Sequence, residues 1–463
     1  MLTDDSDLVL YARDKSMTPY SEWFSLRPEV ALLSASTEEV LEIVRFANKR
    51  RIPVTPRSGG CGFTGNAVPT YGGISLDLKR MDKIIEIDEE NLTATAQSGI
   101  QIQVFDRELR KHGLMYADEP TSFPSNLLGG RIGTNGISYM NSKYGDTIDQ
   151  VVSLQVVLPY GEVARFGGGS GGKATKSSVG YPLKYLFMGH WGTLGIVTEA
   201  TVRIFPVPEA MEMREVAFNS FEGAMKAAQR LVRTGFVFTM LAVSDKHRAL
   251  AIKRSINPSV EIHEGLLSLV LMGTREEVEA VLPRIVKICE EMGGKDLGSS
   301  SEHYETRHYL DTAFPGIGYD MGIGSGNWQC EEYSFPPSLA PEAFENFRKI
   351  LEKHHIAEEE IFTYEIFSFF PKQSEVIMYK LDERDEKRWE DYQKISREMA
   401  DEVLRIGGSV STCHGLGQRR LNDYVKKELG NGFDVMLKIK KALDPNNIMN
   451  PGKMGLDQAY TSD

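Results

Sequence analysis

A glycine-rich loop at residues 56–66 has the clearest chemical potential in this sequence, because it holds four glycines. Glycine adopts positive φ and lets backbone N–H groups approach a ligand closely, and successive N–H groups can hold an anion. The loop could therefore bind a pyrophosphate, and a glycine-rich surface loop without a ligand is an equal alternative. Its spacing fits neither the Walker loop nor the Gly-x-Gly-x-x-Gly turn into a helix. The strand-like run 73–78 follows, so we expect a loop between two strands.

A histidine in a second stretch of small residues is the candidate for proton transfer. His414 lies within residues 407–417, between Cys413 and Gly415. A histidine on such a loop can lie close to a ligand, and a neutral imidazole is a suitable base near pH 7. A lone histidine is more often a structural group, so the residue type alone leaves both roles open. A third stretch, 120–136, is dense in glycine and small residues and could place backbone against a flat ring, or be a coil packed between sheets.

The elements that must position these residues begin with an N-terminal helix. Residues 36–39 are typical of a capping box, and the apolar spacing that follows predicts a helix to about residue 50. Residues 84–87 and 92–96 are strand-like, and the next run is typical of a helix closed by Gly113. This alternation predicts an α/β or α+β cofactor domain.

Residues 151–158 and 162–166 indicate a hairpin in the first part of the chain. The architecture changes after it. From about residue 206, helical patterns alternate with strand-like runs, which predicts an antiparallel sheet covered by helices. The expected helices lie near 221–232, 275–292, 341–354 and 385–406, and the expected strands near 266–272 and 361–370.

The composition excludes several function classes. The chain has 463 residues, so we expect two or three domains, and its net charge of −12 argues against a nucleic-acid binder. The four cysteines are scattered without a Cys-x-x-Cys pair. They provide neither a disulfide framework nor an iron–sulfur or zinc ribbon site, which favours a reducing compartment. No signal peptide or apolar run of membrane-spanning length is present, so we expect a cytoplasmic protein without a membrane span.

Five separated stretches together resemble the FAD-linked oxidases of the vanillyl-alcohol-oxidase and p-cresol-methylhydroxylase (PCMH) type, in particular the FAD subunits of D-lactate dehydrogenase and glycolate oxidase. The resemblance implies an α+β fold with a two-lobed PCMH-type FAD-binding domain in residues 1–207. An α+β cap domain with an antiparallel sheet would follow in residues 208–410, and residues 411–463 would return to the FAD domain. The stretches that carry the resemblance are 56–66, 120–147, 180–200, 407–417 and 442–453.

The same resemblance implies FAD as the cofactor. Cys61 stands where some family members carry a histidine bonded covalently to the flavin and many others a threonine. We therefore expect non-covalent FAD, with a thiol linkage as the alternative. Asn450, which precedes Pro-Gly, is implied to lie beside the flavin ring. The residues implied to bind the cofactor are Pro56, Arg57, Ser58, Gly59, Gly60, Cys61, Gly62, Gly65, Asn66, Pro120, Thr121, Ser122, Gly129, Gly130, Thr134, Asn135, Gly136, Ser142, Tyr144, Gly192, Gly195, Ile196, Val197 and Asn450.

Two catalytic residues are also implied by the resemblance. His414 matches the histidine of the family's His-Gly-x-Gly loop, which faces flavin and substrate, and would act as base or acid while an alcohol carbon is oxidised. Arg307 falls where relatives place a substrate-binding arginine on the cap. Its guanidinium suits a carboxylate or a phosphate, and a surface ion pair is an equal alternative.

Departures from the family pattern argue against a metal. In the metal-dependent 2-hydroxyacid dehydrogenases a metal-binding glutamate precedes the histidine, and here Cys413 takes its place. The upstream strand that supplies two further histidines in those enzymes corresponds to residues 363–370, which contain none. One cysteine and one histidine do not make a zinc site, so we predict no metal. His190 and Trp191 replace the usual Ser-Glu, which leaves their cofactor contacts open.

The leading hypothesis is an FAD-dependent dehydrogenase or oxidase acting on CH–OH groups, which oxidises a small 2-hydroxy acid of the D-lactate or glycolate kind by hydride transfer to the flavin. Because the chain holds no second redox centre, electrons would pass to an external acceptor. An iron–sulfur or electron-transfer flavoprotein partner is expected, in a homo-oligomer or a larger complex.

Two alternatives stay open. One is an enzyme like alkyldihydroxyacetonephosphate synthase, whose chemistry involves no net oxidation. Residues 203–209 resemble that branch weakly, and the single histidine at position 414 counts against it. The other is a flavoprotein subunit that only relays electrons.

Overall fold

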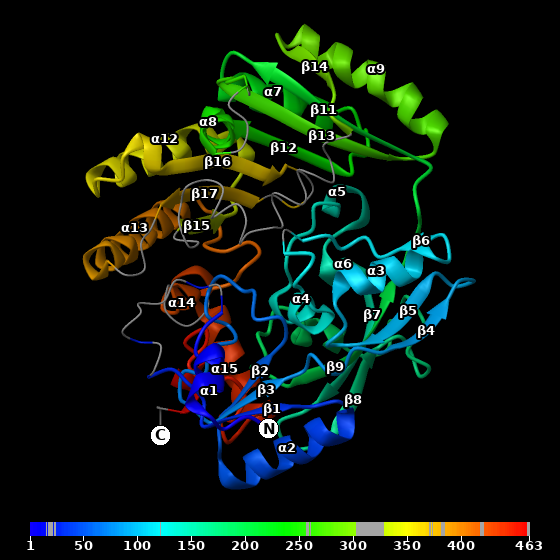
Figure 1. Ribbon diagram of the computed structural model, residues 1–463, viewed down its shortest axis with the longest axis vertical. Helices are drawn as coiled ribbons and strands as arrows, with labels where there is room; N and C mark the ends of the chain where they lie inside the picture. The colour runs from blue at the N-terminus through cyan, green and yellow to red at the C-terminus, as the bar shows by residue number, and fades with distance from the viewer. Residues whose placement is uncertain are drawn as a thin grey trace.

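The computed structural model describes residues 1–463 except 15, 17–21, 23–24, 121, 256–258, 260, 302–327, 370–371, 373, 381–384, 417–420 and 461–463. Figure 1 shows an elongated molecule with a large sheet and its helices at one end and the smaller sheets at the other. Both chain termini lie in the part that holds the smaller sheets. After the sequence prediction, we refer to the end with the smaller sheets as the flavin domain and to the end with the large sheet as the cap, and the domain boundaries stay a prediction.

The first lobe is a three-stranded parallel sheet in the order β1-β3-β2 with one helix. The helix α2 begins after Ser36, whose hydroxyl accepts a hydrogen bond from the Glu39 N–H at 3.3 Å, and ends at Arg51 in the left-handed region. Because β2 and β3 are neighbours, the glycine-rich loop connects two strands, as predicted. The elements are β1 (Val30–Leu33), α2 (Thr37–Arg50), β2 (Val54–Arg57) and β3 (Ile74–Asp77).

The second lobe is a five-stranded antiparallel sheet in the order β4-β5-β9-β7-β8. Phe105 and Ile132, from two helices, share one buried cluster with Leu154 of the sheet. The predicted hairpin of β7 and β8 is confirmed, and so is the helix end at Gly113, which has φ +70°. The elements are β4 (Ile84–Asp88), β5 (Thr93–Gln97), α3 (Ile102–Arg110), β6 (Leu114–Met115), α4 (Leu128–Thr134), α5 (Asn141–Tyr144), α6 (Thr147–Gln150), β7 (Val151–Val157), β8 (Val163–Gly167), β9 (Ile196–Arg203) and β10 (Phe205–Pro206).

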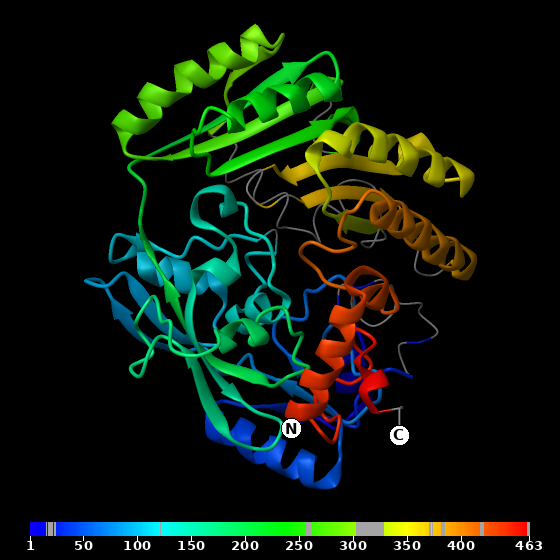
Figure 2. The same ribbon diagram turned by 180° about the vertical axis from the view of Figure 1, so that it is seen from behind.

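The cap is a seven-stranded antiparallel sheet in the order β14-β11-β13-β12-β16-β17-β15. Figures 1 and 2 show its long helices on the outside of the sheet, turned away from the flavin lobes. The opposite face packs a methionine-rich cluster of Met213, Met240 and Val270 against Tyr139 of the flavin domain. The elements are β11 (Ala210–Phe218), α7 (Phe221–Val232), β12 (Met240–Asp245), α8 (Lys246–Ser255), β13 (Gly265–Gly273), α9 (Arg275–Glu291), β14 (Lys295–Ser299), β15 (Trp328–Tyr333), α12 (Ala340–Lys353), β16 (Ile361–Ser368), β17 (Ser374–Lys380) and α13 (Glu386–Arg405).

The C-terminal segment returns to the flavin lobes, and Figure 1 shows α14 and α15 in the same half of the molecule as the smaller sheets. The backbone N–H of Asn450 donates to the carbonyl of Val54 at 2.8 Å, which joins the last turn to β2. Lys440 is buried and donates to Asp444 at 2.6 Å and to the carbonyl of Thr193 at 2.9 Å. The remaining elements are α1 (Asp5–Leu8), α14 (Tyr424–Leu429), α15 (Asn431–Leu443) and the 3-10 helices η1 (Val9–Tyr11), η3 (Leu183–Phe187), η5 (Pro337–Leu339), η6 (Glu358–Glu360) and η7 (Leu456–Tyr460).

Some elements differ from the expectations. Residues 128–134 lie in the stretch expected either as coil or as backbone against a ring, but they form the helix α4 despite their glycines. Gly129 is required there because a Cβ would lie 2.7 Å from Cβ of Ser98. The strands β11 and β12 were not expected. The first is rich in methionine, glutamate and arginine, which favour helices, and pairing with β13 decides its conformation.

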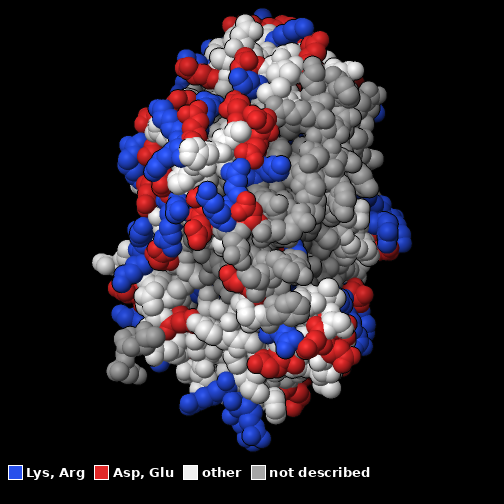
Figure 3. Space-filling model, turned by 60° about the vertical axis from the view of Figure 1, so that its left-hand side comes forward, with Lys and Arg blue, Asp and Glu red and all other residues white. Residues whose placement is uncertain are grey.

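None of the helices in the described part of the chain combines the length and the apolarity that a membrane crossing needs. On the described atoms of the face in Figure 3, Lys and Arg alternate with Asp and Glu instead of forming a basic patch.

Candidate functional site

The turn that carries His414 is held by the glycine-rich loop. The hydroxyl of Thr64 donates to the carbonyl of His414 at 2.8 Å, and the side-chain amide of Asn66 donates to the same oxygen at 3.1 Å. The rings of Phe63 and His414 meet edge to face with centroids 4.5 Å apart. Three residues of the loop therefore fix the backbone of His414 and one side of its imidazole, although about 350 residues separate the loop from His414 in the chain.

Two further predicted segments join this contact. Asn450 is 1% exposed and donates from its amide to the carbonyls of Asn66 at 2.9 Å and Trp191 at 2.6 Å. The Trp191 ring lies against Gly415, where any Cβ would overlap it. Both Asn450 and Trp191 have positive φ, at 40° and 51°. The structure thus brings the loop at 56–66, the turns at 190–192 and 447–452, and the 411–416 turn together.

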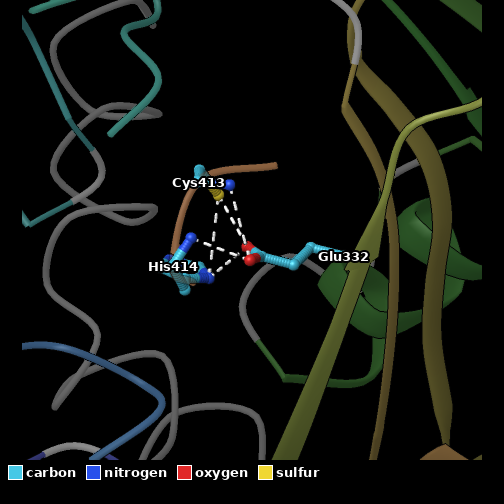
Figure 4. Close-up of side chains that lie close together, drawn as sticks. All are labelled: Glu332, Cys413 and His414. Carbon is cyan, nitrogen blue, oxygen red and sulfur yellow. Dashed lines mark hydrogen bonds and ion pairs between the residues drawn. The ribbon is translucent and has the colours of Figure 1, made fainter. Parts of the chain in front are cut away.

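A glutamate that the sequence analysis missed completes this cluster. Glu332 of β15 is 2% exposed and forms an ion pair with Nδ1 of His414. It accepts the backbone N–H of His414 at 2.7 Å, the thiol of Cys413 at 2.6 Å and the hydroxyl of Ser411 at 2.9 Å. Figure 4 shows its carboxylate directed from the strand toward the turn. The available signal was the pair Glu331-Glu332 inside a strand-like run, because consecutive strand residues face opposite sides and a buried carboxylate needs partners.

The electrostatics of the cluster follow from this geometry. Burial opposes ionisation of Glu332, but its electrostatic interaction and hydrogen bonds with His414 outweigh the effect of burial, so the pKa of this carboxyl is lowered. Burial and the neighbouring Glu332 charge raise the pKa of the Cys413 thiol well above its usual value. The cluster therefore pairs a carboxylate with an imidazole and keeps Cys413 as a neutral thiol that donates its hydrogen.

The same three side chains offer one donor atom each within 4.8 Å of one another, close enough for a single cation. Among the residues that the structure describes, no other group of three His, Cys, Asp or Glu side chains has its donor atoms this close together. The carboxylate already has an imidazole and a thiol as proton donors, so its polar atoms are satisfied without an ion. The absence of a metal stays a prediction.

The predicted cofactor loop forms a cradle that fits a dinucleotide such as FAD. A Cβ at Gly59 would overlap the carbonyl of Ser125, and one at Gly192 would lie 2.8 Å from the Pro56 ring. At Gly130 it would lie 3.1 Å from Ser58. These glycines therefore let the segments pack closely around the loop, and the backbone of Gly59 lies directly against the carbonyl of Ser125. In addition, Oδ1 of Asn450 and of Asn135 are buried acceptors without a hydrogen-bond partner among the described residues.

Other residues of the loop have structural contacts. The Arg57 guanidinium donates to the carbonyl of Arg13 at 2.9 Å and lies 5.2 Å from the Tyr11 ring, so it fixes the N-terminal segment. Its side chain also fills the space above Gly60, which has φ +62°. The Cys61 thiol lies 4.0 Å from the Ser125 carbonyl, and loss of surrounding water raises its pKa.

The second predicted segment is held by a buried ion pair. Arg131 of α4 pairs with Asp118 at 2.5 Å and also donates to the Gly136 carbonyl at 3.0 Å. Thr134 uses its hydroxyl within the helix, donating to Gly130 at 3.0 Å. The adjoining predicted residues Pro120 and Ser122 form a turn in which their carbonyls accept backbone N–H groups.

Several predicted residues lie apart from the His414 cluster. Tyr144 packs on Phe205 with ring centroids 4.8 Å apart, and the hydroxyl of Ser142 contacts Asn141. Gly195 has no room for a Cβ, which would lie 2.8 Å from Val156. The next two residues, Ile196 and Val197, begin β9 and are buried in two hydrophobic clusters. Thr121 and Arg307 lie outside the described residues.

His190, which replaces the serine usual in the family, is buried. Burial, assisted by the nearby Lys440 charge, lowers its pKa to about 3, and it stays neutral. Its carbonyl accepts the Thr193 hydroxyl at 2.6 Å. His190 therefore supports the turn before β9.

Both halves of the chain match models of known protein families. Residues 28–167 match the model of an FAD binding domain, and residues 207–454 match that of the C-terminal domain of FAD linked oxidases. The glycolate oxidase subunit GlcD of Bacillus subtilis is 29% identical over 458 residues, covering 97% of this chain and 93% of that protein. A D-lactate dehydrogenase of Archaeoglobus fulgidus is 29% identical over 429 residues, covering 92% of this chain and 91% of the relative.

Solved structures show the same fold. p-Cresol methylhydroxylase with substrate bound superposes with a TM-score of 0.83 at 21% identity, covering 98% of this chain and 93% of the other. An alkyldihydroxyacetonephosphate synthase superposes with a TM-score of 0.76 at 22% identity, covering 98% of this chain and 82% of the other. The predicted PCMH-type architecture is thereby confirmed.

Proposed function

The chain belongs to the FAD-linked oxidases, and we propose that within this family it oxidises a small 2-hydroxy acid of the D-lactate or glycolate kind. Membership makes it an FAD-dependent oxidoreductase. The relatives named glycolate oxidase subunit and D-lactate dehydrogenase, each 29% identical, support the substrate class.

One observation carries the proposal most directly: Thr64 and Asn66 of the cofactor loop hold the carbonyl of His414. An imidazole fixed to the loop that is proposed to bind the flavin is suited to act on a substrate between the flavin and the imidazole. Bound FAD would accept a hydride from the substrate carbon. His414 would take the hydroxyl proton, and Phe63 would limit the rotation of its ring.

The cofactor-binding residues are proposed from the same cradle. Backbone N–H groups of residues 58–62 would hold the pyrophosphate, and Asn450 with the 190–192 turn would lie beside the flavin ring. We propose non-covalent FAD, because a thiol whose pKa is raised, as in Cys61, is a poor nucleophile. Arg307 remains the proposed ligand of the substrate carboxylate.

Electrons would pass from the flavin to an external acceptor. We propose an iron–sulfur protein or an electron-transfer flavoprotein as this partner. The relative GlcD is named as a subunit, which supports a complex.

The test is anaerobic reduction of the purified holoprotein. We expect the flavin absorbance to bleach on addition of D-lactate or glycolate, and His414→Asn to slow the bleaching strongly while FAD stays bound. The matched control is His112→Asn, a half-exposed histidine paired with Glu89 in the flavin domain. No bleaching with any member of a 2-hydroxyacid panel would contradict the proposal. A flavin adduct with an alkyl phosphate ester and no reduction would favour synthase-type chemistry instead.

A further inference from the structure

The strand β15 carries two consecutive buried glutamates that face opposite sides of the cap sheet. Glu331 is fully buried on the helix side, where it accepts the hydroxyls of Tyr333 at 2.8 Å and Ser396 at 2.5 Å. Glu332 points to the other side, toward the turn that holds His414. The two residues have the same side chain, the same strand and similar burial, but only one of them touches the proposed base.

We propose that Glu332 is a positioning residue that fixes the Nδ1-protonated tautomer of His414 and thereby makes Nε2 the atom that accepts the substrate proton. This inference rests on the proposed function of His414. The inference goes beyond that function because it assigns which ring nitrogen reacts and which residue determines the choice.

The geometry fixes both the ring and its backbone. One oxygen of Glu332, Oε2, faces Nδ1 of His414, and the other, Oε1, accepts the backbone N–H of the same residue at 2.7 Å. A carboxylate only accepts hydrogen bonds, so the nitrogen facing it must carry a proton. In a neutral imidazole the second nitrogen is then unprotonated and has a lone pair available.

The carboxylate is itself held from two further directions. The Cys413 thiol donates to Oε2 at 2.6 Å, and the Ser411 hydroxyl donates to Oε1 at 2.9 Å. These donors restrict its rotation, so the imidazole is oriented by a rigid group instead of by a mobile surface side chain.

The proton and electron balance of the step is complete. FAD bound in the cradle would supply the acceptor for the hydride of the substrate carbon, and Nε2 of His414 would take the proton of the substrate hydroxyl. The imidazolium that forms lies beside the ionised Glu332, which stabilises the positive charge where it develops. No further oxidant or acid is needed for this half-reaction.

The test compares Glu332→Gln, Glu332→Asp and the matched control Glu331→Gln as FAD-loaded proteins. We expect Glu332→Gln to slow anaerobic flavin reduction by about 10–100-fold, because an amide can present its NH₂ to Nδ1 and favour the opposite tautomer. Glu332→Asp should recover part of the rate, and Glu331→Gln should stay within about threefold of the natural protein. FAD content and near-ultraviolet circular dichroism identify any variant that fails to fold.

A second measurement does not depend on turnover. In protein labelled on its histidine nitrogens, the signals that disappear in His414→Asn belong to His414. We expect them to show a protonated Nδ1 and an unprotonated Nε2 in the natural protein and in Glu331→Gln, and a changed pattern in Glu332→Gln. If neutral His414 carries its proton on Nε2 in the natural protein, the inference is overturned. It is also overturned if the flavin of Glu332→Gln is reduced as fast as that of Glu331→Gln. If instead His414→Asn reduces normally, the proposed role of His414 is wrong.

Discussion

The side-chain amide of Asn450 donates to the backbone carbonyl of Trp191 at 2.6 Å across 259 residues of sequence. The same amide reaches Asn66 at 2.9 Å, so one nitrogen connects the C-terminal turn, the turn before β9 and the cofactor loop. All donor capacity of this NH₂ group is used on backbone. The residue therefore sets the spacing of three segments that contact the proposed flavin site.

Replacing Asn450 with Ala should weaken FAD binding about tenfold or more. Two buried hydrogen bonds worth ~1 kcal/mol each are lost, and alanine tolerates the φ of 40° less well than asparagine does. Fluorescence titration of apoprotein with FAD measures the effect. Asn446→Ala is the control, since Asn446 lies in the same turn but donates to Asn48, away from the cluster. Equal FAD affinities in the two variants would contradict the assignment.

Gly415 should be far less tolerant of alanine than Gly407, although both have similar positive φ, 74° and 79°. A Cβ at Gly415 would overlap the Trp191 ring, whereas one at Gly407 has nothing within 4 Å. We expect Gly407→Ala to cost about 1 kcal/mol from backbone conformation, and Gly415→Ala a further 1–3 kcal/mol or so from overpacking. Urea unfolding of both variants checks this. Similar losses would show that Trp191 moves freely.

The sequence predicted the local features of the fold and site because their signals are local. Ser36 predicts the start of α2, and Gly113 predicts that α3 ends just before it. The glycines of residues 56–66 predict the cofactor loop. The resemblance predicted His414 as a site residue near the cofactor loop. Thr64 and Asn66 of that loop do donate to the carbonyl of His414, and the role of its side chain stays a prediction.

The partner of His414 could not be read from the sequence. Glu332 lies 82 residues before it, and strand register alone decides that Glu332 and not Glu331 faces the turn. Pairing of Glu332 with Val376 and of Glu365 with Val376 sets that register through contacts between distant strands. Similarly, α4 is helical against the propensity of its glycines because packing on Ser98 favours it.

Metal removal should leave the reductive half-reaction unchanged. The three donors of Glu332, Cys413 and His414 already satisfy one another through hydrogen bonds and an ion pair. We expect elemental analysis of the purified protein to find no stoichiometric transition metal, and chelator treatment to alter the rate of flavin bleaching by less than about twofold. Added zinc should inhibit, because an ion on Nδ1 would displace the Glu332 contact. Stoichiometric zinc with loss of activity on chelation would contradict the prediction.

Acid should destabilise the cap through Glu332. Its pKa is lowered from 4.5 in the folded state, so its contribution to stability is present above about pH 4.5 and is lost as the pH falls through the folded pKa. Glu332→Gln cannot titrate, and its stability should therefore depend less steeply on pH below 4.5 than that of the natural protein. Thermal unfolding between neutral and acid pH measures the slopes. Parallel curves would show that this carboxyl is not ionised in the fold.

A rise in pH from 4.5 to 8 should destabilise the protein through Glu375. It is fully buried on β17; one oxygen accepts the Phe335 N–H at 3.2 Å, and the other has no partner among the described residues. Burial raises its pKa from 4.5 to about 8, so its stabilising contribution is lost progressively as the pH rises from 4.5 through 8. Each pH unit in that window costs at most about 1.4 kcal/mol. Glu375→Gln keeps the shape of the side chain but cannot titrate. Its free energy of unfolding, measured in urea and compared with that of the natural protein, should therefore increase from pH 5 to pH 8. A constant difference across that range would mean that Glu375 titrates normally.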